Sequence, residues 1–294
     1  LKFLKNWTLP LAMFAGAIGY FLLANVTILE PAKPFVNWLI AVLTPFLIFA
    51  QLLLTFCKIE PKELLPKAWH VWLLSIQAVS SGIIALLLIF CPMEEAYRDI
   101  FEGAMVCLIC PTATAAAVIT GKLGGSASTL TTYTLLSNVL AAIAVPLVFP
   151  LVEPHADITF VVAFLKILSK VFPLLLAPFF IALLFRYYIP SVHRLLSKYH
   201  GVAFYLWAVA LTIVTGQTVR SLVTAAADVS IEIMIALAGL ATCCLQFYFG
   251  KRIGSAYHDR ISAGQALGQK NTVLAIWMAV TYLNPLSSVG PGRR

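Results

Sequence analysis

Apolar runs of about 20 residues recur along the whole chain, and each is long enough to cross a hydrocarbon layer of about 30 Å as a helix. Apolar residues make up 61% of the 294 residues and charged residues only 11%, against about 45–50% and about 25% in soluble domains. Water is therefore not the main solvent for the surface of this chain. Because the runs continue from end to end, we expect one membrane domain over residues 1–294.

Nine candidate spans follow from these runs. They cover residues 6–26, 35–57, 69–91, 101–121, 127–150, 162–186, 202–220, 229–249 and 254–284, the last of them interrupted. No span alternates apolar and polar residues as a barrel strand does, and backbone groups in lipid must be satisfied within their own segment. The sequence therefore predicts an all-α integral membrane protein. Residues 284–292 read like the start of a further helix, so we expect a tenth span that the sequence lacks, and ten spans would divide into five and five.

The positively charged residues predict the orientation. With a cytoplasmic N-terminus, the inner side receives Lys2, Lys5, Lys58, Lys62, Lys67, Lys122, Arg186, Arg194, Lys198, Lys251, Arg252 and Arg260. The outer side receives Lys33, Arg98 and Arg220, with Lys166 and Lys170 near the outer end of the sixth span. This bias follows the positive-inside rule, so we predict a multi-pass protein of the cell inner membrane with a cytoplasmic N-terminus. Since the cations stand in loops and not along one polar face, the net charge of +8 does not indicate nucleic acid binding.

Two predicted spans are interrupted near their middle. The fourth contains Cys110-Pro111-Thr112-Ala113-Thr114, where proline removes a backbone donor and clashes with the preceding turn. The ninth contains a polar run at residues 264–272. Taken singly, each is explained by a proline kink or by a cytoplasmic loop between two short spans. Together they occupy the fourth position of each half, and paired interruptions point to a transporter site, where helix ends would turn amides and a positive dipole towards an anion.

The interrupted segments also resemble a known family. Cys110-Pro111-Thr112-Ala113-Thr114-Ala115-Ala116-Ala117 and Leu130-Thr131-Thr132 resemble the fourth and fifth spans of the bile acid:sodium symporter family. Ala266-Leu267-Gly268-Gln269-Lys270-Asn271-Thr272 resembles its ninth-span motif, whose usual form is Glu-x-Gly-x-Gln-Asn. Gln77 in the third span and Thr44-Pro45 near the start of the second span also match positions of the family.

This resemblance implies ten helices in inverted repeats of five, the first over about residues 1–150 and the second over about residues 158–294. It implies a core domain of spans three to five and eight to ten, in which the fourth and ninth spans cross. Spans one, two, six and seven would form a panel domain. The family works by alternating access, in which one domain moves against the other, and its substrates are organic anions.

The sequence departs from the family at the residues that bind sodium. The resemblance places the ninth-span glutamate at Ala266 and the following glutamine at Lys270, and a Ser-Asn pair of the fourth span at Ala116 and Ala117. A hard cation needs several oxygen ligands and usually a nearby negative charge, whereas these alanines offer only backbone carbonyls. We therefore predict transport that does not depend on sodium, with ordinary sodium-coupled symport as the alternative.

Lys270 is the most informative change, because an ammonium at the bilayer midplane costs about 3 kcal/mol on insertion scales. Our main hypothesis is that Lys270 replaces the sodium ion and bridges the two breaks through Gln77, Thr132 and free carbonyls. Burial favours the neutral amine, so release and rebinding of its proton would offer proton coupling. Lys270 could instead bind a substrate carboxylate directly, or extend to the cytoplasmic surface with no role in transport.

The candidate site residues form two sets. The residues expected to bind the substrate are Thr112, Ala113, Thr114, Lys270, Asn271 and Thr272. The residues of the former cation region are Gln77, Ala116, Ala117, Ser128, Thr132, Ala266, Leu267, Gln269 and Lys270. Polar members of the first set could instead cap the broken helix ends, and those of the second could make ordinary hydrogen bonds between helices.

Other functional classes fit the sequence less well. No span places a nucleophile near a base or clusters His and acidic residues, so we expect no enzyme, catalytic residue, metal or cofactor. A channel would need a polar ring along a continuous pore, whereas polarity here is concentrated at two breaks. A membrane sensor that binds the same anion without transporting it would have the same sequence features. The expected partners are the lipid bilayer and a small organic anion, and no feature specifies an oligomeric state.

Overall fold

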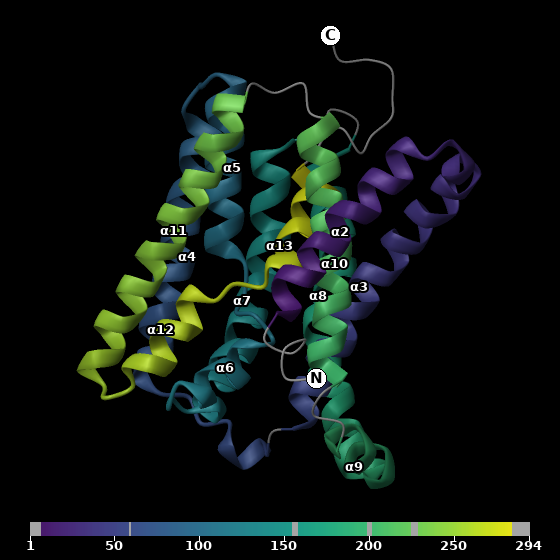
Figure 1. Cartoon of the computed structure of the whole chain (residues 1–294). Helices are drawn as coiled ribbons and strands as arrows, with labels where there is room; N and C mark the ends of the chain where they lie inside the picture. The colour runs from purple at the N-terminus through teal and green to yellow at the C-terminus, as the bar shows by residue number, and fades with distance from the viewer. Residues whose placement is uncertain (1–6, 59, 155–157, 199–201, 225–228, 284–294) are drawn as a thin grey trace.

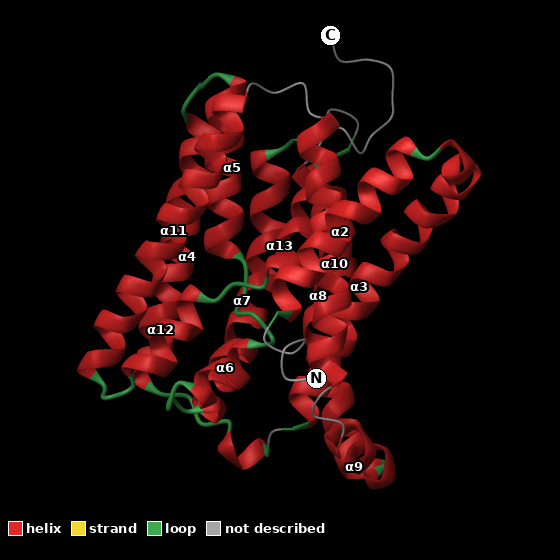
Figure 2. Cartoon of the chain, in the orientation of Figure 1, coloured by secondary structure: helices red, strands yellow, loops and turns green. Residues whose placement is uncertain are grey.

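The computed structural model describes residues 7–58, 60–154, 158–198, 202–224 and 229–283. Within these ranges the regular elements are helices, and no named strand occurs among them (Figure 2). The prediction of an all-α protein is therefore confirmed. The expected tenth span falls on residues 284–294, which lie outside the described residues.

The helices follow one another in two sets. The first half of the chain contains α2 (Thr8–Asn25), α3 (Lys33–Cys57), α4 (Ala68–Phe90), α5 (Glu95–Ile109), α6 (Ala116–Lys122) and α7 (Ala127–Val152). The second half contains α8 (Phe160–Tyr188), α9 (Pro190–Lys198), α10 (Val202–Thr224), α11 (Val229–Ala256), α12 (Arg260–Gly268) and α13 (Thr272–Met278). Short 3-10 helices at Thr27–Ala32 and Pro61–Glu63 lie before α3 and α4, and a π-helical turn at Ala279–Leu283 follows α13.

Six of the described helices are long and apolar enough to cross a membrane by themselves, namely α3 with the turn before it, α4, α7, α8, α10 and α11. A shorter apolar stretch belongs to α2, and the fourth and ninth predicted spans are each divided into two helices. Apolar side chains also cover the outer faces, where Phe14 is 66% and Phe90 is 74% exposed. Exposed apolar surface of this extent marks contact with lipid or another apolar partner.

The helices form two groups that lie side by side (Figure 1). In the first group, α2 packs on α10, and α3 packs on α8 and α10. In the second group, α5 and α7 pack on α4, and α11 packs on α5 and α12. The groups meet where α7 contacts α8. Helix α13, which follows α12 of the second group in the chain, contacts α3 and α10 of the first group. The first group holds the helices of predicted spans one, two, six and seven.

Glycines allow the closest helix contacts. Where α2 crosses α10, a Cβ atom on Gly16 would overlap the carbonyl oxygen of Thr212, and Gly216 faces Gly16 from the other helix. On α11, a Cβ atom on either Gly250 or Gly254 would lie 2.6 Å from an atom of Ala263 on α12. Small residues let helices approach in this way in lipid, so both contacts depend on glycine.

The loops at the two ends of the bundle differ in charge. The lower end in Figure 1 holds the α3–α4 and α6–α7 loops, helix α9 and the α11–α12 turn. The described cations in or beside these segments are Lys58, Lys62, Lys67, Lys122, Arg186, Arg194, Lys198, Lys251, Arg252 and Arg260. The described cations beside the upper loops are Lys33, Arg98 and Arg220. Lys2 and Lys5 lie outside the described residues.

Candidate functional site

Two helix interruptions lie at mid-height of the bundle (Figure 1). The first covers residues 110–115, between α5 and α6, and includes Pro111, which has no amide hydrogen to continue a helix. The second covers residues 269–271, between α12 and α13. Each interruption leaves backbone groups of its own helix without their usual partners.

The two breaks are bonded to each other through their backbones. The amide of Ala113 donates to the carbonyl of Gln269 at 2.9 Å, and the amide of Asn271 donates to the carbonyl of Pro111 at 2.9 Å. Because buried backbone groups must be paired, each break supplies partners that the other lacks. The crossing therefore leaves fewer amides available for an anion than the sequence pattern suggests.

Thr112 lies at the centre of this crossing, opposite Lys270 in a single antiparallel bridge. The Thr112 side chain is fully buried, and its hydroxyl donates to the carbonyl of Ala266 at 2.7 Å. Its amide donates to the hydroxyl of Ser137 on α7 at 3.2 Å. The hydroxyl and amide of Thr112 thus hold the crossing together.

Lys270 reaches from the second break towards the end of α5. Its Nζ donates to the carbonyl of Leu108 at 3.3 Å. Within the described ranges, no acidic side chain forms an ion pair with Lys270. A cation without a counter-ion therefore joins the second break to α5.

Gln77 supports the first break from α4. Its buried side-chain amide donates to the carbonyls of Ile109 at 2.9 Å and Cys110 at 3.2 Å. The Gln77 side-chain oxygen accepts a hydrogen bond from the hydroxyl of Tyr133 at 3.1 Å. Since a helix end leaves carbonyls unpaired, Gln77 caps α5. The hydrogen bonds of Gln77 go to these groups and not to Lys270.

The region predicted for a cation is filled by packed side chains. Ala116, Ala266 and Leu267 are fully buried, and they pack in one cluster with Trp69 and Tyr133. Ala117 packs against the same cluster. No carboxylate belongs to the described members of this cluster. A sodium ion needs several oxygen ligands, so the side chains present here do not fit one.

Three other residues of that predicted region have different surroundings. The Ser128 hydroxyl donates to the carbonyl of Glu63 at 3.0 Å, towards the lower end of the bundle. The Thr132 hydroxyl donates to the carbonyl of Ser128 within α7 at 3.2 Å. Gln269 lies in the second break, and its buried side-chain oxygen has no hydrogen-bond partner among the described residues. None of these hydrogen bonds joins one of the three side chains to another.

Of the remaining residues predicted to bind the substrate, two form hydrogen bonds through their side chains and one is exposed. The Thr114 hydroxyl donates to the side-chain oxygen of Gln51 on α3 at 3.2 Å, which links the first break to the other helix group. The side-chain oxygen of Asn271 accepts from the amide of Leu274 at 3.2 Å and caps α13. Thr272 is exposed. Sequence reasoning did not single out Gln51, whose buried amide nitrogen has no partner within the described ranges.

A cavity of about 480 Å³ lies between the two helix groups. Its walls come from α3, α8 and α10 of the first group and from α13 with its π-helical turn. The lining residues are Ile40, Ala41, Thr44, Pro45, Lys170, Leu174, Gln217, Trp277, Val280 and Thr281. We call this the inter-group cavity.

Lys170 is the charged residue of the inter-group cavity. It stands ten residues after Phe160 at the start of α8, which is about 15 Å along the helix. The position of Lys170 near the outer end of its span stays a prediction. No ion pair to Lys170 occurs among the described residues. A lysine well inside an apolar segment is itself a signal of function.

Comparison with known proteins decides the family. A family model described as the sodium bile acid symporter family matches residues 44–225, which is more than half of the chain. The chain belongs to this family. A comparison with curated proteins finds no match. The predicted family is thus confirmed, and members of the sodium bile acid symporter family are membrane transporters and not enzymes. The matched range contains the first break and Lys170, and α11 to α13 follow it.

Proposed function

We propose that this member of the sodium bile acid symporter family is a secondary active transporter of an organic anion that needs no sodium. The observation that carries the proposal is the crossing of two broken helices beside Lys270, which has no acidic partner among the described residues. Paired interruptions at depth are typical of transporter sites. A cation at such a crossing favours a negatively charged ligand.

The two helix groups support alternating access as the mechanism. We propose that the first group acts as the panel and the second as the core, and that the inter-group cavity opens to each side in turn. The hydrogen bond from Thr114 to Gln51 joins the first break to the panel. A movement of one group against the other would have to break or remake this bond, which makes it a candidate marker of the conformational state.

The inter-group cavity supports an organic anion as the substrate. Its volume of about 480 Å³ falls within the range of about 300–1,000 Å³ that small-molecule sites occupy. Lys170 would bind the anionic group, with Gln217 as a further hydrogen-bond donor. Trp277 and the aliphatic wall residues would contact the apolar body of the substrate.

We extend the proposal to the whole architecture. Residues 1–294 would form one membrane domain of two inverted repeats, about 1–150 and about 158–294, each containing one broken helix. The lower end of the bundle carries most of the described loop cations, and this bias supports placing it at the cytoplasm. The N-terminus would then be cytoplasmic and the protein would reside in the cell inner membrane.

The packed cluster at the former cation region supports independence from sodium. Ala116, Ala117 and Ala266 supply no side-chain oxygen there, and Lys270 already brings a positive charge to the crossing. We propose that this ammonium replaces the coupling ion, and that loss and return of its proton would couple transport to protons. Ordinary sodium-coupled symport is the alternative that an experiment has to separate.

Uptake into proteoliposomes tests the proposal. A panel of labelled organic anions would be supplied with external sodium, potassium or choline at equal ionic strength. We expect the same uptake rate in all three salts, and a pH gradient would reveal proton coupling. A steep sodium dependence that potassium cannot replace would restore sodium-coupled symport. Binding of an anion without any flux would instead identify a membrane sensor.

A further inference from the structure

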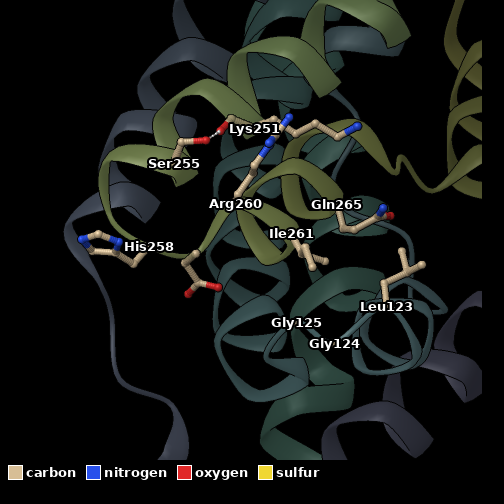
Figure 3. A pocket seen from close by; sticks show the side chains of 10 residues that line it. Leu123, Gly124, Gly125, Lys251, Ser255, His258, Arg260, Ile261 and Gln265 are labelled. Carbon is tan, nitrogen blue, oxygen red and sulfur yellow. Dashed lines mark hydrogen bonds between the residues drawn. The ribbon is translucent and has the colours of Figure 1, made fainter.

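A second cavity, of about 760 Å³, lies beside the α11–α12 turn at the lower end of the bundle, and Figure 3 shows the side chains that line it. Its walls come from the α6–α7 loop, the end of α11, the α11–α12 turn and the start of α12. All of these belong to the second helix group, whereas the inter-group cavity is lined mostly by the first group. We call this the turn cavity.

The turn cavity carries unpaired positive charge. Lys251 from α11 and Arg260 from α12 line it, together with His258 in the turn (Figure 3). Among the described residues, neither Lys251 nor Arg260 forms an ion pair. The acidic residue of the wall, Asp259, is already paired with Lys67 at 2.9 Å. Two cations therefore face the cavity without an acidic partner.

The position of Lys251 is set by close packing between α11 and α12. A Cβ atom on Gly264 of α12 would lie 2.7 Å from Cγ of Lys251, so the lysine stem lies flat where α12 has no side chain. The Lys251 Nζ then lies 5.8 Å from the ring centre of Phe247. Gly250 and Gly254 bring the two helices into contact on either side of this point. Lys251 and Arg260 thus come from α11 and α12, and the glycine contacts fix the spacing between these two helices.

The turn cavity lies at the level expected for lipid headgroups. The Trp72 indole nitrogen donates to the hydroxyl of Tyr257 at 3.0 Å, beside the same turn. Trp and Tyr side chains are enriched at the membrane–water interface. In the proposed orientation this is the cytoplasmic interface, where anionic lipids give the membrane a negative surface.

We propose that the turn cavity binds the phosphate group of an anionic phospholipid between Lys251 and Arg260. The guanidinium offers a planar pair of donors to phosphate oxygens, and the ammonium acts as a point charge. Helix α12 runs from this cavity to the second break. A bound phosphate group fixes the start of α12 against α11 and so supports the crossing. A soluble phosphate offers the same chemistry, and the experiment separates the two sources.

Thermal unfolding of the purified chain in neutral detergent tests the site. The additions are dioleoyl phosphatidylglycerol, dioleoyl phosphatidylcholine and inorganic phosphate, at constant ionic strength. The test variant is Lys251→Gln with Arg260→Gln. The matched control, Lys122→Gln with Arg252→Gln, removes two exposed cations of the same end that do not line the cavity. Ligands of the folded state raise the unfolding midpoint by mass action.

We expect phosphatidylglycerol, and not phosphatidylcholine, to raise the midpoint of the parent and the control. In the test variant the apparent affinity for phosphatidylglycerol should fall by at least about tenfold, because two charged hydrogen-bond donors are lost. An equal shift in the test variant, or an equal effect of phosphatidylcholine, overturns the site. If inorganic phosphate raises the midpoint, phosphatidylglycerol does not, and the test variant abolishes the rise, the site binds soluble phosphate and the proposal of a lipid is overturned.

Native mass spectrometry of the unsubstituted chain gives a readout that does not require a variant to fold. Preferential retention of phosphatidylglycerol over phosphatidylcholine is expected, and equal retention overturns the proposal. Neither measurement involves uptake of an organic anion. The lipid site can therefore fail while the proposed transport stands, and the reverse also holds.

Discussion

Thr112 and Lys270 face each other as a single antiparallel bridge at the point where two helices have stopped. The flanking backbone bonds, from Ala113 to Gln269 and from Asn271 to Pro111, are both 2.9 Å long. Irregular backbone at membrane depth is tolerated only where protein satisfies it. The two breaks satisfy each other, which explains why a proline in one half of the chain comes with a polar run in the other.

Replacing Lys270 tests the charge at this crossing. Lys270→Met keeps an unbranched side chain that is one atom shorter, but removes the ammonium and the bond to the carbonyl of Leu108. We expect a folded protein whose uptake of an organic anion falls by at least about tenfold, equivalent to about 1.4 kcal/mol. Uptake in proteoliposomes is the measurement, with Lys122→Met, an exposed lysine of α6, as the control. Uptake equal to that of the control would show that the ammonium has no role.

Removing the amide of Gln77 should destabilise the first break. Gln77→Leu leaves the carbonyls of Ile109 and Cys110 and the hydroxyl of Tyr133 without their partner. We expect a loss of about 1–3 kcal/mol in the free energy of unfolding, whereas Tyr133→Phe should cost about 0.6 kcal/mol, a typical value between membrane helices. Unfolding in mixed detergent micelles measures both. If both variants cost the same, Gln77 does not cap α5.

The Gln77 and Tyr133 effects should also be coupled. Once Gln77 is replaced, the Tyr133 hydroxyl no longer has that acceptor, so the double variant should lose less than the sum of the two single losses. Additive losses would mean that the 3.1 Å contact contributes nothing to stability.

Local signals in the sequence were sufficient to predict helices and their interruptions. Pro111 lacks an amide hydrogen, and polar residues at 264–272 interrupt the apolar sequence, so each marks a break without reference to the rest of the chain. The break itself is shorter than the polar run, because α12 continues to Gly268. The partners of each side chain depend on distant helices. Gln77 was expected to support a cation region, but α4 directs it to the end of α5, and no local pattern encodes that choice.

The neighbours of Lys170 could not be predicted from charge alone for a related reason. Lys170 was placed near the outer end of its span from the sequence, but the cavity that it shares with residues of α3, α10 and α13 depends on how distant helices pack. The close approach of α2 and α10 at Gly16 was also missed. A single glycine in a helix indicates neither a partner helix nor a crossing point.

The contact between α2 and α10 gives a matched pair of stability predictions. Gly16→Ala places a Cβ atom on the carbonyl oxygen of Thr212, whereas a Cβ atom on Gly19 of the same helix meets no atom within 4 Å. We expect Gly16→Ala to cost about 1–3 kcal/mol through overpacking. Gly19→Ala should be neutral or stabilising by up to about 1 kcal/mol, because alanine favours a helix. Equal unfolding midpoints for the two variants would contradict the close crossing.

The last prediction concerns recognition of the anion in the inter-group cavity. Lys170→Gln keeps a polar side chain of similar length but removes the positive charge that lines this cavity. A charged hydrogen bond lost to the substrate should raise KM for anion uptake by about tenfold or more. Lys166→Gln is the control, since Lys166 is exposed one turn earlier on α8 and does not line the cavity. Concentration-dependent uptake into proteoliposomes gives KM and the maximal rate for each variant.

A rise in KM confined to Lys170→Gln supports direct binding of the anionic group, because a change in the helix or in the surface charge would affect both variants. Equal KM values for the two variants would place the anion elsewhere, and would leave Lys270 as the cation that recognises it.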